Sequence, residues 1–287
     1  MNIAIKNMLA KYDCQTRDDY ENALKEILQE LALLGLWRAK FFEHAALYGA
    51  TSAKLLYDAD RYTESLNFSL LAPSADFKLT PYLTAIDAEL SSMGFSVEVS
   101  EKSKTTQTPI ESAFIKAGTK EHLIKIAVPD SLVESIGKND ALKIKIEIDT
   151  DPPAGFQTEA KTLLQPIPFS VVTYKEPDLF AGKLHAILQR AWQGRVKGRD
   201  YYDFVWYIGR GTPVRLAHLE QRLRQTGGWT KAKAMTLKDL HELLLEKFGT
   251  VDFAQAKADI RPFIKDPDSL ALWSREFFES LVPRLKD

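Results

Sequence analysis

The amino-acid sequence predicts an α+β fold, in which a mixed sheet with flanking helices is followed by a helical C-terminal region. Strands are indicated where apolar and polar residues alternate, most clearly in LKIKIEID, residues 142–149. Helices are indicated where apolar residues recur every three or four positions. After Glu176 only the helical pattern is strong, so we predict an α/β domain over residues 1–175 and a helical domain over residues 176–287.

The same two patterns locate the individual elements. In the first half the spacing predicts helices over residues 20–36, 51–58 and 79–93. Alternation and turn residues predict strands over residues 65–70, 95–99, 110–115, 142–149, 157–164 and 169–173. In the second half the spacing predicts helices over residues 176–192, 199–208, 214–224, 236–248 and 268–284.

Composition narrows the class of protein. A chain of 287 residues can bury a full core, and its formal net charge of −1 indicates no global basic field for nucleic acid, although a local patch can still bind it. A single cysteine, Cys14, excludes an intramolecular disulfide framework and a multi-cysteine zinc site, and is typical of a reducing compartment. No apolar run approaches the ~20 residues of a membrane span. We therefore expect a soluble, cytoplasmic protein.

The stretch RYTESLNFSL, residues 61–70, combines strand alternation with small polar residues. Because side chains alternate along a strand, Ser65 and Asn67 lie together on the face opposite the apolar residues. The same geometry places Glu147 and Asp149 on one face of the strand over residues 142–149. The polar faces of these two strands are therefore candidates for a functional site.

Three longer runs resemble the AbiEii/AbiGii toxin family, which belongs to the nucleotidyltransferase superfamily related to DNA polymerase β. FFEHAALYGATSAKLLYDADRYTESLNFSL, residues 41–70, is similar to the family pattern Gly-Gly/Ser-Thr-Ala, a helix, then Arg-x-Ser-x-Asp-Leu-Asp-Phe. KIKIEIDTDPP, residues 143–153, matches a second region. EPDLFAGKLHAILQRAWQGRVKGRDYYDF, residues 176–204, resembles the signature Lys…Arg…Arg-Asp-x-Tyr-Asp, and IRPFIKDP, residues 260–267, is similar in kind. The runs occur in the expected order.

The resemblance implies a nucleotidyltransferase-type fold that uses NTP and Mg²⁺. In this superfamily a small loop presents the amides of a helix N-terminus to the phosphates, which requires a glycine and a neighbouring hydroxyl. Gly49, Thr51 and Ser52 can form that nucleotide-binding loop. The alternative is structural, with Gly49 ending a strand and Thr51 acting as an N-cap.

The metal motif departs from the family pattern. Where Asp-Leu-Asp is expected, this chain has Ser65, Leu66 and Asn67, so two negative charges are missing. In the family, carboxylates at these positions hold Mg²⁺ against the triphosphate, and a third on a neighbouring strand activates the attacking hydroxyl. The Asn67 amide oxygen can ligate Mg²⁺, whereas Ser65 is a weak substitute. We expect little conventional catalysis.

Three explanations compete for this departure. The chain is a pseudoenzyme that still binds nucleotide or a partner, or it is a deliberately inactivated form, or its metal site has moved. In the last case the metal site lies at Glu147 and Asp149. The catalytic candidates are then Ser65, Asn67, Glu147 and Asp149, and the candidate metal ligands are Asn67 and Glu147. The alternative for this strand is a solvated face on which Lys143 and Lys145 pair with those carboxylates.

A second group of candidates is basic. Lys183 and Arg190 are spaced i and i+7 on a predicted helix and share one face, and Arg195, Lys197 and Arg199 follow. Lysine binds phosphate as a point charge and arginine adds bidentate contacts, so we assign Lys183, Arg190 and Arg199 to nucleotide binding. Asp200 is included because it can hold one of these cations in position. Its alternative role is to cap the following helix.

We expect positions 49, 65, 67, 147 and 183 to converge on one cleft. The resemblance implies a toxin that transfers a nucleotide from NTP to an acceptor such as RNA and is paired with an antitoxin encoded beside it. Replacement of the metal carboxylates favours reduced or absent activity, with weak NTP binding that depends little on Mg²⁺. The alternative is a non-catalytic nucleotide- or partner-binding regulatory protein on the same fold.

Overall fold

The structure is a computed structural model that describes residues 3–102, 108–126, 128–134, 136–137, 139–190 and 196–287. The chain divides into two compact units. Unit 1 comprises Met1–Leu56, Tyr62–Pro152 and Glu159–Thr173, and unit 2 comprises Tyr57–Arg61, Pro153–Thr158 and Tyr174–Asp287. Each unit is described separately below. The division into functional domains at residue 175 stays a prediction.

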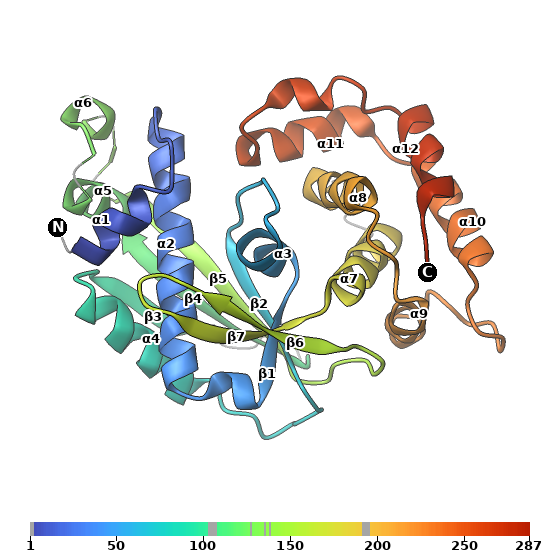
Figure 1. Ribbon diagram of the computed structural model, residues 1–287, viewed down its shortest axis with the longest axis horizontal. Helices are drawn as coiled ribbons and strands as arrows, with labels where there is room; N and C mark the ends of the chain where they lie inside the picture. The colour runs from blue at the N-terminus through green and yellow to red at the C-terminus, as the bar shows by residue number, and fades with distance from the viewer. Residues whose placement is uncertain (1–2, 103–107, 127, 135, 138, 191–195) are drawn as a thin grey trace. The chain divides into compact units, whose positions relative to one another are not determined.

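Unit 1 is built on a seven-stranded sheet. Its strands are Ala45–Tyr48 (β1), Ser65–Leu70 (β2), Val97–Glu101 (β3), Ile110–Gly118 (β4), Ala141–Asp149 (β5), Thr158–Leu163 (β6) and Phe169–Tyr174 (β7). The strand order is β3-β4-β5-β2-β1-β7-β6 (Figure 1). β2 runs parallel to β5 and antiparallel to β1, which is itself parallel to β7. The mixed sheet confirms the predicted fold class.

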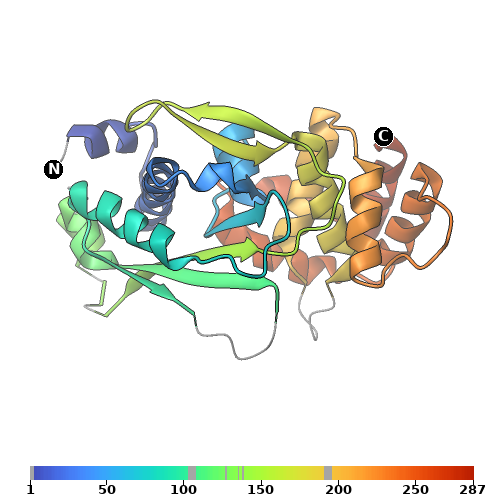
Figure 2. The ribbon, with the colours of Figure 1, turned by 90° about the horizontal axis from the view of Figure 1, so that it is seen from below.

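The core of unit 1 forms around one long helix. The helices of this unit are Ile3–Leu9 (α1), Arg17–Arg38 (α2), Ala50–Tyr57 (α3), Thr80–Ser92 (α4), Thr119–Lys125 (α5) and Asp130–Val133 (α6), with a 3₁₀ turn at Phe41–Glu43. Thr16 starts α2 through a capping box with Asp19. Leu24, Ile27 and Leu31 of α2 are fully buried, and the sheet curves around this helix (Figure 2).

Unit 2 is predominantly helical. Its helices are Glu176–Gln189 (α7), Gly198–Arg210 (α8), Leu216–Gln225 (α9), Leu237–Phe248 (α10), Phe253–Ile260 (α11) and Arg275–Leu281 (α12), with 3₁₀ turns at Arg261–Phe263, Pro267–Leu270 and Val282–Arg284. Aromatic side chains fill the core: Phe204 of α8 lies 5.5 Å from Phe248 of α10, measured between ring centroids. A Cβ on Gly198 would lie 1.8 Å from the carbonyl oxygen of Ala256. Only glycine therefore fits where α8 meets α11.

The predicted elements agree with the structure to within a few residues except near the C-terminus. The sequence patterns missed β1, α1, α5, α6 and α11. The single helix predicted over residues 268–284 is wrong, because the chain forms a 3₁₀ turn, a break and then α12. The Ser274 hydroxyl accepts a hydrogen bond from the amide of Phe277 and so starts α12 as a separate helix. None of the helices in the described ranges is long and apolar enough to cross a membrane.

Candidate functional site

The candidate residues of unit 1 gather on one face of the sheet. β2 and β5 pair in parallel with Ser65 opposite Lys145 and Asn67 opposite Glu147. Residues directly opposite each other on paired strands point to the same side of the sheet. Asn67 and Glu147 therefore share a face, as predicted, and Asp149 lies on the same side, two residues further along β5.

Hydrogen bonds within this face show how its polar groups are used. The Asn67 Nδ2 group donates to the Ser65 hydroxyl at 2.9 Å. The Lys145 ammonium lies 2.6 Å from Glu147 Oε1, with both side chains about one-third exposed, at 40% and 31%. This ion pair is the charge pairing that was the alternative prediction for the β5 face. Asp149 Oδ1 accepts a hydrogen bond from the backbone amide of Asp151 at 3.1 Å.

These ligands do not fit a Mg²⁺ centre with paired carboxylates. Mg²⁺ prefers charged oxygen ligands at close to octahedral geometry. On β2 the available groups are a hydroxyl and an amide that bond to each other, and the Glu147 carboxylate is already paired with a lysine. Within the described ranges, no group of three or more His, Cys, Asp or Glu side chains is placed to hold a metal ion.

The loop before α3 packs against this face. Gly49 has φ of +79°, a conformation that other residues rarely adopt, and a Cβ there would lie 3.7 Å from the Asn67 amide. The Thr51 hydroxyl donates to the carbonyl of Ser65 at 2.5 Å, and Ser52 shares a 2.6 Å hydrogen bond with Thr173. Both hydroxyls are fully buried and hold α3 on the sheet. Their predicted contact with a nucleotide stays a prediction, and the N-cap alternative does not apply to Thr51, because α3 begins at residue 50.

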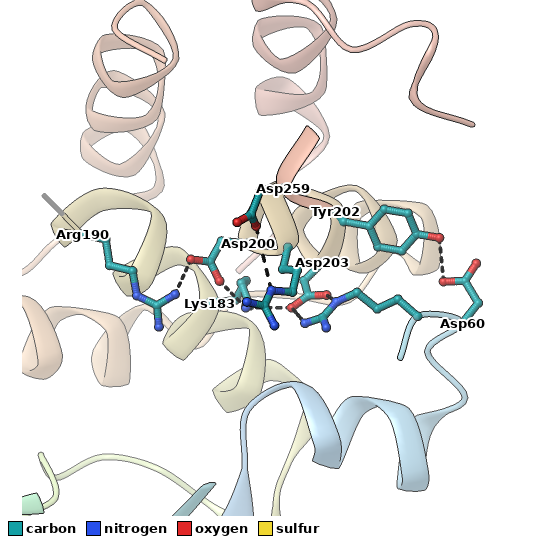
Figure 3. A network of polar contacts seen from close by, with 9 residues as sticks. Asp60, Lys183, Arg190, Asp200, Tyr202, Asp203 and Asp259 are labelled. Atoms are coloured by element: carbon teal, nitrogen blue, oxygen red, sulfur yellow. Dashed lines mark hydrogen bonds and ion pairs between the residues drawn. The ribbon is translucent and has the colours of Figure 1, made fainter. Parts of the chain in front are cut away.

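Unit 2 contains a buried ion-pair network of five residues (Figure 3). Lys183 Nζ lies between two carboxylates, 2.6 Å from Asp200 Oδ1 and 2.7 Å from Asp203 Oδ2. Arg190 pairs with the second oxygen of Asp200 at 2.6 Å. Arg61 donates two hydrogen bonds to the Asp203 carboxylate, at 2.5 and 2.7 Å. Asp200 thus contacts two of the predicted cations, and its role in positioning them for a nucleotide stays a prediction.

The network combines three cations with two carboxylates. Burial by itself would raise the pKa of Asp203, but the ion pairs with Arg61 and Lys183 outweigh it and lower the pKa to about 2. The pKa of Asp200 is lowered in the same way by Lys183 and Arg190. Lys197 lies nearby, and burial, reinforced by the charge of Arg190, lowers its pKa to about 8. Both aspartates are therefore ionised at neutral pH.

The depressed pKa of Asp203 predicts a loss of stability in acid. A carboxylate whose pKa is lower in the folded than in the unfolded state stabilises the fold above its unfolded pKa, near 4. We expect about 2–3 kcal/mol from Asp203 to be present above about pH 5 and to disappear as the pH falls towards about 2. Urea unfolding between pH 2 and 7 measures this. The slope below pH 4 should flatten in Asp203→Asn, and an unchanged slope would contradict the assignment.

The remaining candidates have other surroundings. Arg199 Nε lies 3.9 Å from Asp259 Oδ2, and its guanidinium stacks over the ring of Phe263 at 4.1 Å. These contacts hold α8 to α11 and to the 3₁₀ turn at Arg261–Phe263, and a nucleotide contact for Arg199 stays a prediction. Arg195 lies outside the described residues. Lys183 belongs to unit 2, so its convergence with the strand face of unit 1 also stays a prediction.

Two members of the network were not among the predicted site residues. Arg61 is only 3% exposed and Asp203 is 5% exposed, and they are separated by 142 residues in the sequence. Both were visible as motif positions, because Arg61 matches the arginine of the family pattern Arg-x-Ser, where this chain has Thr63 in place of serine, and Asp203 closes the Arg-Asp-x-Tyr-Asp signature. Nothing in the spacing of either residue indicated that they pair. Tyr202 makes a similar link, donating to Asp60 at 2.9 Å.

The fold and the motifs define a nucleotidyltransferase-type protein. The sequence matches the family described as nucleotidyl transferase AbiEii toxin, type IV toxin–antitoxin system, over residues 31–277, and the chain belongs to this family. A comparison with curated proteins finds no match.

Two solved structures are similar to this chain. MenT4, a nucleotidyltransferase toxin from Mycobacterium tuberculosis H37Rv, is similar at 12% identity with a TM-score of 0.52, covering 98% of this chain and 89% of that chain. JHP933 from Helicobacter pylori is 14% identical with a TM-score of 0.49, covering 91% of this chain and 90% of its own. At these identities the likeness to MenT4 shows a shared fold.

Proposed function

We propose that this chain binds a nucleoside triphosphate and, as it stands, transfers its nucleotide slowly or not at all. One observation carries the proposal. The face on which the family places its metal carboxylates holds an amide bonded to a hydroxyl, Asn67 to Ser65, while the cationic network around Lys183 is complete. We therefore expect the chain to retain phosphate binding and to bind a metal ion poorly.

Each unit offers one candidate for phosphate binding: the network in unit 2 and the loop before α3 in unit 1. Lys183 is held rigidly by two carboxylates, and Arg190, with 37% of its side chain exposed, can turn its remaining N–H groups to a ligand. Three cations against two carboxylates leave a net positive charge. Gly49 contributes by opening the N-terminus of α3, where the first amides lack partners within the helix.

Charge balance predicts that Mg²⁺ matters less here than in a relative with Asp-x-Asp. A triphosphate and two adjacent carboxylates repel each other unless a metal ion lies between them. With Ser65 and Asn67 in these places that repulsion is absent, and the cations can contact the phosphates directly. Losing a preorganised charge stabiliser typically costs a factor of about 10² to 10³ in rate. Slow transfer is the expected consequence.

RNA is the proposed acceptor, and an antitoxin encoded beside the gene is the proposed partner. The stretch 174–287 carries 20 Lys and Arg residues against 15 Asp and Glu residues, so the helical unit is basic although the whole chain has a formal charge of −1. A basic surface attracts the phosphate backbone. A winged-helix regulator gene immediately upstream would support the toxin assignment.

The alternative is a regulatory protein that binds a nucleotide or a partner without catalysis. Glu147 favours it, because this carboxylate forms an ion pair with Lys145 instead of standing free for a metal ion. The two candidates predict the same nucleotide binding. They differ in whether the Ser65→Asp, Asn67→Asp variant transfers labelled nucleotide to RNA.

Nucleotide titration with and without Mg²⁺ tests the proposal. We expect the affinity for ATP or GTP to change less than about tenfold when Mg²⁺ is removed, because the phosphates contact protein cations. Arg190→Met should weaken binding by about 10-fold or more, since a hydrogen bond to a charged group is lost. Lys183→Met should act in the same direction. Lys238→Met, at an exposed position on α10, is the matched control.

Two outcomes would reject the assignment. One is nucleotide binding that requires Mg²⁺ in the unmodified chain, which would mean that a metal site exists. The other is equal binding by Arg190→Met, Lys183→Met and the Lys238→Met control. Thermal unfolding of each variant checks that the network variants remain folded.

A further inference from the structure

A pocket of about 230 Å³ lies within unit 2 where α7, α9 and α10 meet. Its apolar lining consists of three leucines, one from each helix: Leu188, Leu223 and Leu243. Leu223 is fully buried and forms the base of the pocket. Leu188 and Leu243 are half-buried and line its opening to solvent. Small-molecule sites commonly combine apolar walls of this kind with a few polar groups.

The polar group best placed in this pocket is the amide of Gln189, the last residue of α7. It lines the pocket, is half-buried, and makes no hydrogen bond to any residue that the structure describes. The amide lies directly over Gly228: a Cβ at that position would be 2.1 Å from Gln189 Nε2 and 2.6 Å from its Cδ. The missing side chain at residue 228 is therefore what lets the amide occupy the pocket.

Two charged groups complete the lining. Glu246 is exposed at the rim, and Lys247 reaches back to donate to the carbonyl of Arg190 at 3.4 Å. Arg190 follows Gln189 directly and belongs to the ion-pair network through Asp200. The pocket thus adjoins the cations that bind phosphate in the proposed function, and both lie in unit 2.

We propose that this pocket binds an adenine base. A flat ring suits leucine walls, and a glutamine amide offers one donor and one acceptor that match N7 and the N6 amino group of adenine. Guanine presents two acceptors at the same edge, which would leave the amide oxygen without a donor. The Glu246 carboxylate can accept a further hydrogen bond from an exocyclic amine. The inference deepens the proposed function, because it names the base that accompanies the bound phosphates.

The base can come from a free nucleotide or from the end of an RNA acceptor, and the titration separates these sources. Adenosine, ATP, GTP and a short RNA ending in adenosine are added in turn to the full chain. The side-chain amide signal of Gln189, assigned by its loss in Gln189→Leu, reports binding at this place. Adenosine carries no phosphate, so it tests the pocket independently of Lys183 and Arg190.

We expect adenosine to shift the Gln189 signal, and ATP to bind more tightly than GTP by about fivefold or more, the scale of one bidentate base contact. Gln189→Leu should remove that preference. Gly228→Ala should also remove the preference for ATP, because its Cβ displaces the flexible end of Gln189. This second variant shows whether the loss in Gln189→Leu comes from the missing amide or from a folding defect. Gln221→Leu, at an exposed position on α9, should leave the preference intact.

The outcomes are distinguishable. A stronger shift with RNA than with ATP assigns the pocket to the acceptor, and the reverse assigns it to the nucleotide donor; both support an adenine site. If adenosine leaves the Gln189 signal unchanged while ATP and GTP bind equally, the pocket proposal fails and the proposed function stands. If no nucleotide binds at all, the proposed function fails, and adenosine alone then decides the pocket.

Discussion

Replacing Asp203 by alanine is expected to lower the free energy of unfolding by about 3–5 kcal/mol. The change leaves the Arg61 guanidinium, only 3% exposed, without its two hydrogen bonds and without a neighbouring negative charge. A buried charge that loses its partner costs far more than the pair itself contributes. Lys183 also loses one of its two carboxylates, so the ammonium becomes less well fixed.

Urea unfolding at pH 7 measures this effect, and Glu242→Ala is the matched control, because Glu242 is an exposed carboxylate on α10 of the same unit. The double variant Arg61→Met, Asp203→Leu separates the two possible causes. Replacing both partners of a buried pair by apolar groups is often neutral, so most of the lost stability should return. A single variant within about 1 kcal/mol of the unmodified protein would show that the pair is not buried in solution.

The residue pattern predicted β2 and β5 because the alternation of apolar and polar residues is a property of each strand's own sequence. Alternation alone placed Ser65 and Asn67 on one face of β2, and Glu147 and Asp149 on one face of β5. The side-by-side position of β2 and β5 is a long-range pairing, which the residue pattern cannot show. It became predictable only through the resemblance to a family, which implied that both strands contribute to one site.

The ion-pair network shows what sequence reasoning could not supply. Lys183 and Arg190 were recognised as cations on one helical face, but the pattern does not reveal which carboxylates approach them. Arg61 and Asp203 are 142 residues apart, and neither periodicity nor propensity couples positions at that separation. Thr51 shows the same limit: the sequence left its hydroxyl available to a ligand or to the backbone, and only the structure shows that it donates to the Ser65 carbonyl. Its contact with a nucleotide stays a prediction.

Restoring both carboxylates, in the variant Ser65→Asp, Asn67→Asp, is expected to raise Mg²⁺-dependent nucleotide transfer by about 10²-fold or more. The two positions lie i and i+2 on β2, and position 67 is directly opposite Glu147 on the parallel strand β5. The variant would therefore place four carboxylates on one face, at positions 65, 67, 147 and 149, and hard cations prefer charged oxygen ligands of this kind. Transfer of labelled nucleotide to bulk cellular RNA, with and without Mg²⁺, measures the gain.

The matched control for this variant is Ala160→Asp, Thr162→Asp, which adds two carboxylates at the same spacing to exposed positions of β6. It has the same charge as the test variant and should show no gain. Adding Glu147→Gln to the restored variant should remove most of the gain, because one ligand is withdrawn from the face. If the unmodified chain already transfers nucleotide as fast as the restored variant, positions 65 and 67 do not limit catalysis. Glu147 and Asp149 would then be the first residues to replace in the search for the metal ligands.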